Sequence, residues 1–237
     1  MPKPEPSESK ASAPKGPRRA SLAQERSRAT RRKLVRVALA LWTEAGFATG
    51  IEETTVEDIA RAAGVTKGTF YFHFAHKEDI LLELGWNAAD RIYEATGKAL
   101  AERLTIDESL LHVLAVLARQ IEQVPREAVA RSLAEFHRAS SSQVTNPGHT
   151  AFPSSFAALF RHARDAGELP ASVDPADLGN VMNALAMDSI LLWTIDGSRD
   201  LRASFAARAE LVLAGARATG EADAKAGTAG RARANFH

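Results

Sequence analysis

The sequence predicts an all-α protein of about nine helices, on the strength of three observations. Apolar residues recur at three- and four-residue spacing through most of residues 34–218, which is the period of an amphipathic helix. Ser, Thr or Asp stands before several of these segments, and Gly or Pro stands between them. No segment shows the two-residue alternation that is typical of a strand. With 237 residues, 45% apolar and 25% charged, the chain has the composition of a soluble protein of one or two domains.

The first four expected helices are short or strongly amphipathic. The first helix covers Leu34–Ala45, and Gly46 stops it. A capping-box pattern, Thr54 with Glu57, opens the second helix at Val56–Ala63. Thr66 caps a third helix, and a long fourth helix starts at a lysine; their ranges are Lys67–Phe74 and Lys77–Leu104.

Five more helices are expected in the second half of the chain. Asp107 caps the fifth helix, and Pro125 stands where the sixth begins. The seventh helix follows Pro153, and Asp174 with Pro175 opens the eighth. Ser198 caps the ninth, which runs to Ala218.

The two ends of the chain differ from the part between them. Five of the ten prolines lie in residues 1–17, among Ser and Lys, and residues 219–237 are rich in Gly, Ala and Arg without a period. Such segments bury too little apolar surface to fold alone. We therefore expect disordered arms at 1–24 and 219–237, flanking one domain at 25–76 and a second at 77–218.

Charge is distributed unevenly along the chain. The net charge is +1, but residues 1–33 hold ten Lys/Arg and three Glu, a balance of +7, which leaves −6 for the rest. A basic end on an acidic body predicts a polyanion-binding end, with a solvated tail as the alternative.

Several classes of protein are disfavoured. The chain has no cysteine, which excludes disulfides, thiolate-held metals and a thiol nucleophile. It lacks G-x-S-x-G, P-loop and G-x-G-x-x-G motifs, and its histidines show no H-E-x-x-H spacing. We therefore expect no enzyme activity, no cofactor and no metal. The longest apolar stretches are near nine residues and no secretory signal is evident, so a cytoplasmic protein without a membrane segment is expected.

Residues Thr55–Phe74 predict a helix-turn-helix, in which two short helices flank a turn at Gly64 and Val65. A helix of about eight residues is marginal alone, and Gly68 weakens the second one further. The second helix must therefore be held by its neighbours. The expected inward face consists of Ile59, Ala60, Ala63, Val65, Phe70 and Phe74.

The second helix of this motif places an aromatic residue on its outer side. At 100° per residue, Phe72 lies about 200° from Phe70 and therefore points away from the core, on the same side as Gly68. This arrangement fits the close approach of a DNA groove, in which Phe72 touches a thymine methyl and Lys67 and Thr69 reach base edges or phosphates. The alternative is that Phe72 packs on another helix.

The segment GVTKGTFYFHFAHKEDIL, with TTVEDIARAAG and the first helix before it, resembles the DNA-binding domain of the tetracycline-repressor (TetR) family over about residues 27–84. The resemblance implies the following DNA contacts. Base edges are met by the start of the recognition helix, Thr66, Lys67, Gly68 and Thr69. Phosphates are met by Thr55, Tyr71, His73 and Lys77. A basic arm follows phosphates or enters the minor groove, and it consists of Arg26, Arg28, Arg31, Arg32 and Lys33. A hydrogen-bonded structural role is the alternative for His73.

The sequence departs from the family pattern at two places. Residues Ala48–Glu53 make the link before the motif a few residues longer than usual. Glu57 places an acid on the groove side of the first motif helix, where it either completes the capping box or opposes base contact from that helix.

For the rest of the chain, the resemblance implies a homodimer formed through the last two helices, Pro175–Ile195 and Ser198–Ala218, that reads a palindromic operator. It also implies a pocket for a small-molecule effector, expected to be apolar or aromatic. Candidate lining residues are the body's aromatic and Met side chains, Trp86, Tyr93, Phe136, Phe152, Phe156, Phe160, Met182, Met187 and Trp193. Plain core packing is the alternative for each of them.

The implied function is a repressor that its ligand releases from DNA. The alternatives are an activating or ligand-independent regulator, a sequence-tolerant DNA-organising protein and a helical enzyme.

Overall fold

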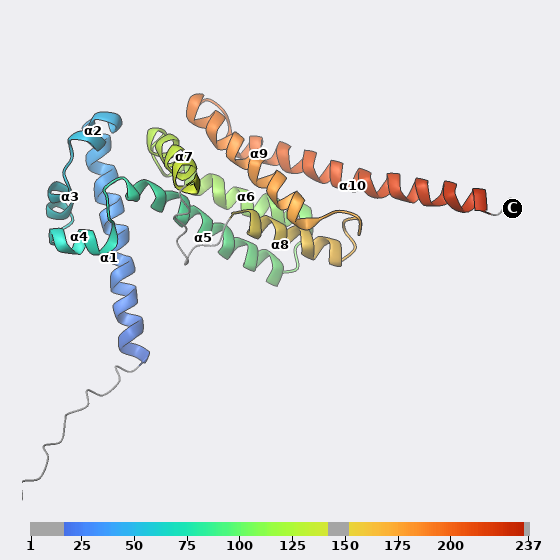
Figure 1. The fold of residues 1–237 in the computed structure, drawn as a ribbon, viewed down its shortest axis with the longest axis horizontal. Coiled ribbons are helices and arrows are strands. Elements are labelled where there is room, and N and C mark those ends of the chain that lie inside the picture. Colours follow the sequence, from blue (N-terminus) through green and yellow to red (C-terminus); the bar gives the residue numbers. More distant parts are fainter. Residues whose placement is uncertain (1–16, 142–151, 235–237) are drawn as a thin grey trace, which may run out of the picture.

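The computed structural model describes residues 17–141 and 152–234, and within them every regular element is a helix. A small head built mainly from the first four helices is joined by a long helix to a larger helical body (Figure 1). The helices are α1 (Pro17–Glu44), α2 (Phe47–Glu53), α3 (Val56–Ala62), α4 (Lys67–His73), α5 (Asp79–Ala101), α6 (Ile106–Glu122), α7 (Arg126–Ser141), α8 (Phe152–Asp165), α9 (Pro175–Ile195) and α10 (Leu201–Ala234).

Helix α2 occupies the segment that was expected to be an irregular link, so the described residues hold ten helices and not nine. Gly46 makes the turn into it with φ of 81°. Phe47 then packs edge-on against Trp42, with ring centroids 5.9 Å apart. A seven-residue helix is too short to show a helical period in sequence.

The outer helices are longer than expected. Helical structure covers residues 17–24 and 219–234, all of which lie in the two arms that were expected to be disordered. Both stretches contain Ala and Arg, which are good helix formers and favour continuation of the helix. Residues 1–16 and 235–237 of the expected arms lie outside the described residues.

Three helix caps differ from expectation by a few residues. Helix α3 is opened by Thr55, and not by Thr54 with Glu57, because the Thr55 hydroxyl accepts from the backbone N of Asp58. Thr105 replaces the expected Asp107 at the start of α6, and at α10 the carboxylate of Asp200 accepts from a first-turn N–H, where Ser198 was expected. Since neighbouring residues can cap equally well, spacing alone could not choose between them.

The described residues form two apolar cores, and α5 contributes to both. Its first turn supplies Ile80 and Leu81 to the head core, which also buries Leu34, Trp42 and Phe70. The rest of α5 supplies residues 88–99 to the body core, together with α6, α8, α9 and α10. The head and the body are therefore connected by a continuous helix.

Candidate nucleic-acid interface

The helix-turn-helix consists of α3, a turn and α4, and its inward face agrees with the sequence prediction. Gly64 has φ of 65°, and the backbone N of Val65 donates to the carbonyl of Ala60 at 2.9 Å, which ends α3. Ile59, Ala60, Ala63, Phe70 and Phe74 are buried, and Val65 is half-buried. Burial of these side chains holds two seven-residue helices that would not persist alone.

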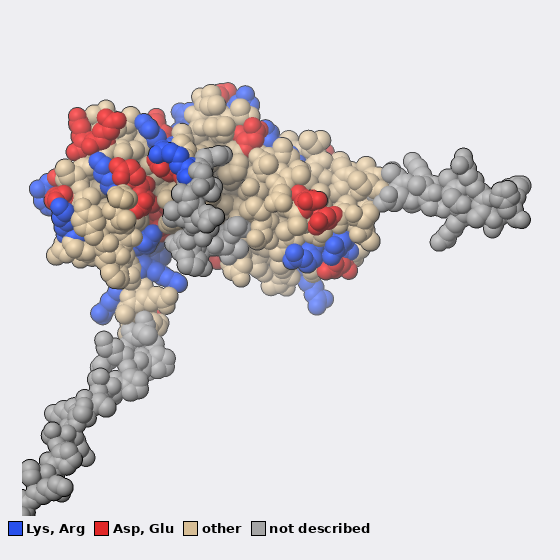
Figure 2. All heavy atoms as spheres, viewed as in Figure 1, with Lys and Arg blue, Asp and Glu red and all other residues tan. Residues whose placement is uncertain are grey.

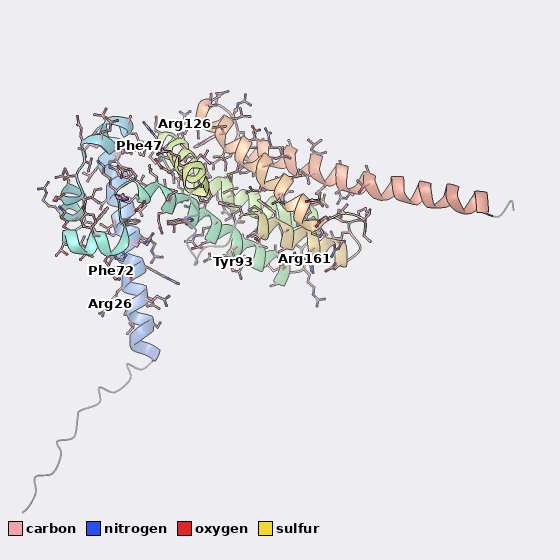
Figure 3. The ribbon with its side chains drawn as sticks, in the orientation of Figure 1. Arg26, Phe47, Phe72, Tyr93, Arg126 and Arg161 are labelled. Atoms are coloured by element: carbon pink, nitrogen blue, oxygen red, sulfur yellow. The ribbon has the colours of Figure 1, made fainter. Side chains whose placement is uncertain are left out.

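The outer face of α4 carries exposed aromatic side chains. Phe72 is 77% exposed and Tyr71 is also exposed, so the expected outward direction of Phe72 is confirmed. Helix α4 lies on the side of the head that is turned away from the body, and Phe72 lies on that outer side (Figure 3). The ring of His73 lies edge-on to Phe72, with centroids 5.0 Å apart. An exposed aromatic ring of this kind is available to a partner surface.

Thr66 and Thr69 fix the start of α4. The Thr66 hydroxyl accepts from the backbone N of Thr69 at 3.1 Å and shares a 2.9 Å hydrogen bond with its hydroxyl. A Cβ added at Gly68 would meet only the Thr66 hydroxyl, at 3.7 Å, so the chain has open space there. The beginning of α4 is therefore ordered by side chains and open to close approach.

Lys67 is held by Glu57. The ammonium group donates to the Glu57 carboxylate and lies 5.8 Å from the centre of the Tyr71 ring. The hydrogen bond lowers the pKa of Glu57 and raises that of Lys67. The Glu57 side chain therefore contacts the first residue of α4 and does not form the capping box that was expected for it.

Arg31 makes contacts within the head and is half-buried. Its Nε donates to Oε2 of Glu83 at 2.7 Å, its Nη1 donates to the carbonyl of His73 at 2.7 Å, and its guanidinium lies 4.4 Å from the centre of the Phe74 ring. Burial, and next the charge of Arg31, lowers the pKa of His73. Arg31 thus differs from the exposed arm residue that was expected.

Glu83 was missed by the sequence reasoning. It is a buried carboxylate on α5 and the partner of Arg31. The available signal was an acid inside the apolar run DILLELGW, because acids in such runs are seldom buried without a partner.

Lys77 and Thr55 are two expected phosphate contacts, and both make hydrogen bonds to other residues of the head. The Lys77 ammonium donates to the carbonyls of Glu52 at 3.1 Å and Thr54 at 2.9 Å. It precedes α5, which begins at Asp79, and so joins the end of α2 to the chain that enters α5. The Thr55 hydroxyl donates to Asp58 at 2.6 Å. Both side chains shape the head.

From Arg26 onward, the basic residues of α1 other than Arg31 are exposed. Arg26 extends from the part of α1 that projects beyond the head (Figure 3), and the lower part of the head shows several blue groups in Figure 2. The exposed basic side chains are Arg26, Arg28, Arg32, Lys33 and Arg36. They lie on a helix, so their spacing relative to the head is fixed.

The expected ligand-lining residues fall into two groups. Those on α8 and α9 lie in or against the body core, namely Phe152, Phe156, Phe160, Met182, Met187 and Trp193. Tyr93 and Phe136 are exposed, and Tyr93 points outward from α5 in Figure 3; Trp86 is half-buried. The structure therefore does not gather all the candidates in one place.

Two buried hydroxyls in the body were not singled out from the sequence. Thr96 of α5 and Ser155 of α8 are buried, and neither Oγ atom has a hydrogen-bond partner. Unpaired buried hydroxyls are uncommon, so they mark a place where a polar atom would be accommodated. Across the described part of the chain, no group of His, Asp and Glu side chains is arranged to hold a metal.

The N-terminal part of the chain is similar in sequence to known bacterial regulators. Residues 34–84 match the model of bacterial regulatory proteins of the tetR family. The chain is 46% identical over 71 residues to the transcriptional regulator TcmR of Streptomyces glaucescens, which is 30% of this chain and 28% of TcmR. It is 33% identical over 97 residues to AcrR of Shigella flexneri, 38% of this chain and 43% of AcrR. The chain thus spans less than half of these curated relatives, both of which are transcriptional regulators.

Among solved structures, FadR of Thermus thermophilus has a similar fold over a longer range. This TetR-family repressor was solved with lauroyl-CoA; it shares 26% identity and a TM-score of 0.61, over 77% of this chain and 93% of FadR. The helix-turn-helix segment is therefore that of a TetR-family regulator, and the fold of most of the chain is shared with FadR, a TetR-family repressor.

Proposed function

We propose that this chain is a sequence-specific DNA-binding transcriptional regulator, a repressor that a small molecule releases from a palindromic operator. The observation that carries the proposal is the outer face of α4. There Phe72 and Tyr71 are exposed and Lys67 stands at the first position of the helix, while a buried core holds the helix in place. An exposed aromatic ring next to a basic residue suits the major groove, where methyl groups and acceptor atoms are presented.

The DNA contacts divide into two kinds. Lys67, Thr69 and Phe72 face base edges, and the exposed arginines of α1 supply phosphate contacts beside the recognition helix. Thr66, Gly68, Tyr71 and His73 border the same face of α4, so they complete the contact surface. Arg31, Thr55 and Lys77 support this surface through hydrogen bonds to other residues of the head.

A homodimer through α9 and α10 would give two such heads. Helix α9 is long and apolar enough to pass a composition test for a membrane span, although its buried side chains pack in the body. Its outward side exposes Val181, Leu191 and Ile195, which is 74% exposed, and α10 exposes Leu211, which is 67% exposed. The three- and four-residue spacing of a helix–helix seam is followed by Val181, Ala184, Leu191 and Ile195. The remaining position of this series is Asp188, which pairs with Arg208 of α10. An isologous contact there would produce the two-fold symmetry that a palindrome requires.

An apolar effector fits the body. Aromatic and aliphatic side chains of α5, α8 and α9 pack there, and Thr96 and Ser155 add two unpaired hydroxyls. FadR of Thermus thermophilus, whose fold is similar, binds lauroyl-CoA. A ligand with a long apolar part and a polar group is therefore the best candidate for this chain too.

Release of the operator follows from the coupling between ligand binding and DNA binding. A ligand that binds better to a body in which the heads are displaced from operator spacing lowers operator affinity, by no more than its differential affinity for the two states. Helix α5 carries such a change, because it is packed in both cores.

The test is selection of duplexes from random DNA by the full chain, followed by binding at several salt concentrations. The expected result is a palindrome, with a log–log salt slope that reports several phosphate contacts. Phe72→Ala is expected to reduce affinity for that palindrome. The control Leu111→Ala removes an exposed side chain on α6 and is expected to change nothing. Failure to enrich any duplex would contradict the proposal.

A further inference from the structure

The pair formed by Glu57 and Lys67 connects the two helices of the motif. Glu57 is the second residue of α3 and Lys67 is the first residue of α4, and their charged groups are hydrogen-bonded. Both side chains are about half exposed, so the pair lies at the surface of the head. A surface ion pair contributes little to the stability of a protein. The stability of the fold therefore does not explain why this pair is present on the helix-turn-helix.

Glu57 lies in the first turn of α3 but takes no part in its capping box. The capping box of α3 is made by Thr55 and Asp58, and the Glu57 carboxylate takes no part in it. The carboxylate is instead directed to the ammonium group of Lys67, which the Tyr71 ring approaches from a second side. The long and flexible Lys67 side chain is thereby restricted before any DNA arrives.

A carboxylate on a DNA-binding face is unfavourable next to phosphates, but it has one good partner among the bases. In the major groove, cytosine presents its N4 amino group as a donor, and guanine presents N7 and O6 as two acceptors. An ammonium beside a carboxylate offers donors and an acceptor in the complementary arrangement. Opposite an A·T pair read in the same manner, the carboxylate would meet the O4 acceptor or the methyl group of thymine.

We propose that Glu57 and Lys67 act together to read one G·C base pair in each operator half-site, with Lys67 donating to guanine and Glu57 accepting from the amino group of cytosine. This inference rests on the proposed DNA-binding function and gives a specificity role to the acid on α3. It also separates the motif into two reading elements, the charged pair between α3 and α4 and the apolar ring of Phe72 on the outer side of α4.

The experiment selects operators from random duplexes with the unmodified chain, Glu57→Ala, Lys67→Ala and the double variant. The unmodified chain is expected to select a G·C pair at one symmetric position of each half-site, and replacement of that pair by A·T weakens its binding about 5- to 150-fold. In each of the three variants the same replacement has little effect. Because the two residues work as a unit, the double variant loses no more discrimination than either single variant.

Salt dependence gives a second readout. In Glu57→Ala the freed Lys67 is expected to turn to a phosphate, which steepens the log–log salt slope by about one. The control is Glu94→Ala on α5, where an exposed acid paired with Arg91 at 3.0 Å is removed from a different helix. It changes the net charge equally and is expected to alter neither the slope nor the selected base.

The outcomes are distinct. If the unmodified chain enriches no duplex, the proposed function fails and this inference fails with it. If an operator is enriched and its G·C preference persists in Glu57→Ala, the function stands and this inference is overturned. A thermal melt of each variant identifies any loss of fold, which is not expected because the Thr55–Asp58 cap remains.

Discussion

Arg31 of α1 and Glu83 of α5 are joined at two points, since Nε and Nη2 of the arginine lie 2.7 and 2.6 Å from the same carboxylate oxygen. The remaining terminal nitrogen of Arg31 donates to the carbonyl of His73, the last residue of α4. One side chain therefore connects the basic helix, the recognition helix and the helix that enters the body. The orientation of α4 relative to α5 depends directly on this contact.

Removal of Glu83 is expected to destabilise the head. In Glu83→Ala the half-buried guanidinium loses its counter-charge, and breaking such a pair costs about 3 kcal/mol, at the lower end for buried pairs because Arg31 keeps some contact with water. Urea unfolding followed by circular dichroism measures the loss. Glu94→Ala, in the exposed pair with Arg91, should cost about 0.5 kcal/mol or less. Equal losses in the two variants would contradict a structural role for Glu83.

Lys77 is expected to act on DNA binding only through the shape of the head. Lys77→Met keeps the side-chain length but removes the hydrogen bonds to Glu52 and Thr54, so the free energy of unfolding should fall by about 2 kcal/mol. Operator affinity should fall while its salt slope stays unchanged, because no phosphate contact is lost. A slope reduced by about one would show that Lys77 contacts phosphate. Lys98→Met, on the exposed side of α5, is the control.

Two helical glycines should respond in opposite directions to alanine. A Cβ at Gly50 would lie 2.5 Å from the carbonyl oxygen and 2.6 Å from the Cα of Trp42, so Gly50→Ala forces α2 away from α1 and should destabilise by about 1–3 kcal/mol. Gly97 has nothing within 4 Å of such a Cβ and is exposed on α5. Gly97→Ala should therefore stabilise by about 0.5–1 kcal/mol. Thermal unfolding of both variants makes the comparison, and a neutral Gly50→Ala would refute the close approach.

His73 should make stability depend on pH. Its pKa in the folded chain is below the ordinary 6.5 because of burial and the neighbouring Arg31, so the unfolded chain binds the proton more readily. The contribution of His73 is complete above about pH 6.5 and is lost as the pH falls from there towards the lower folded pKa. Urea unfolding between pH 5 and 8 should show this decline, and His73→Gln should remove part of it. Identical pH profiles for the variant and the unmodified chain would exclude His73 as a source.

The proposed dimer interface can be tested with single charges. Ile195→Asp or Leu211→Asp places a carboxylate on the apolar side of α9 or α10, and either is expected to convert a dimer to a monomer in sedimentation. Because two heads are needed for a palindrome, operator affinity should fall as well. Leu111→Asp, an exposed leucine on α6, should leave the dimer intact. Dissociation by all three variants would indicate a general loss of fold.

Sequence patterns predicted the elements that repeat and missed those that depend on distant contacts. The inward residues of the motif, the outward Phe72 and the Thr66 cap follow from periodicity and local chemistry, and the structure has them as expected. The contact of Arg31 with Glu83 joins residues 52 positions apart, and no local pattern encodes it. For the same reason Lys77, which resembles a phosphate contact by position, was not expected to bind two carbonyls more than 20 residues earlier.

Helix ends and tails were harder to predict, because several choices there have nearly equal energy. Thr54 and Thr55 are adjacent, and each has an acid three residues later, so the position of the cap depended on where the turn after α2 stopped. The outer ends of α1 and α10 contain good helix formers such as Ala and Arg, and composition gives no clear end for such a helix.

The head core also has a consequence for how the chain can be divided. Ala128 of α7, more than 40 residues beyond the helix-turn-helix, is fully buried in that core, where α7 packs against α2 and α5. A fragment that stopped before α7 would expose this side of the head to water. During synthesis, the N-terminal lobe therefore cannot complete its packing until α7 has left the ribosome.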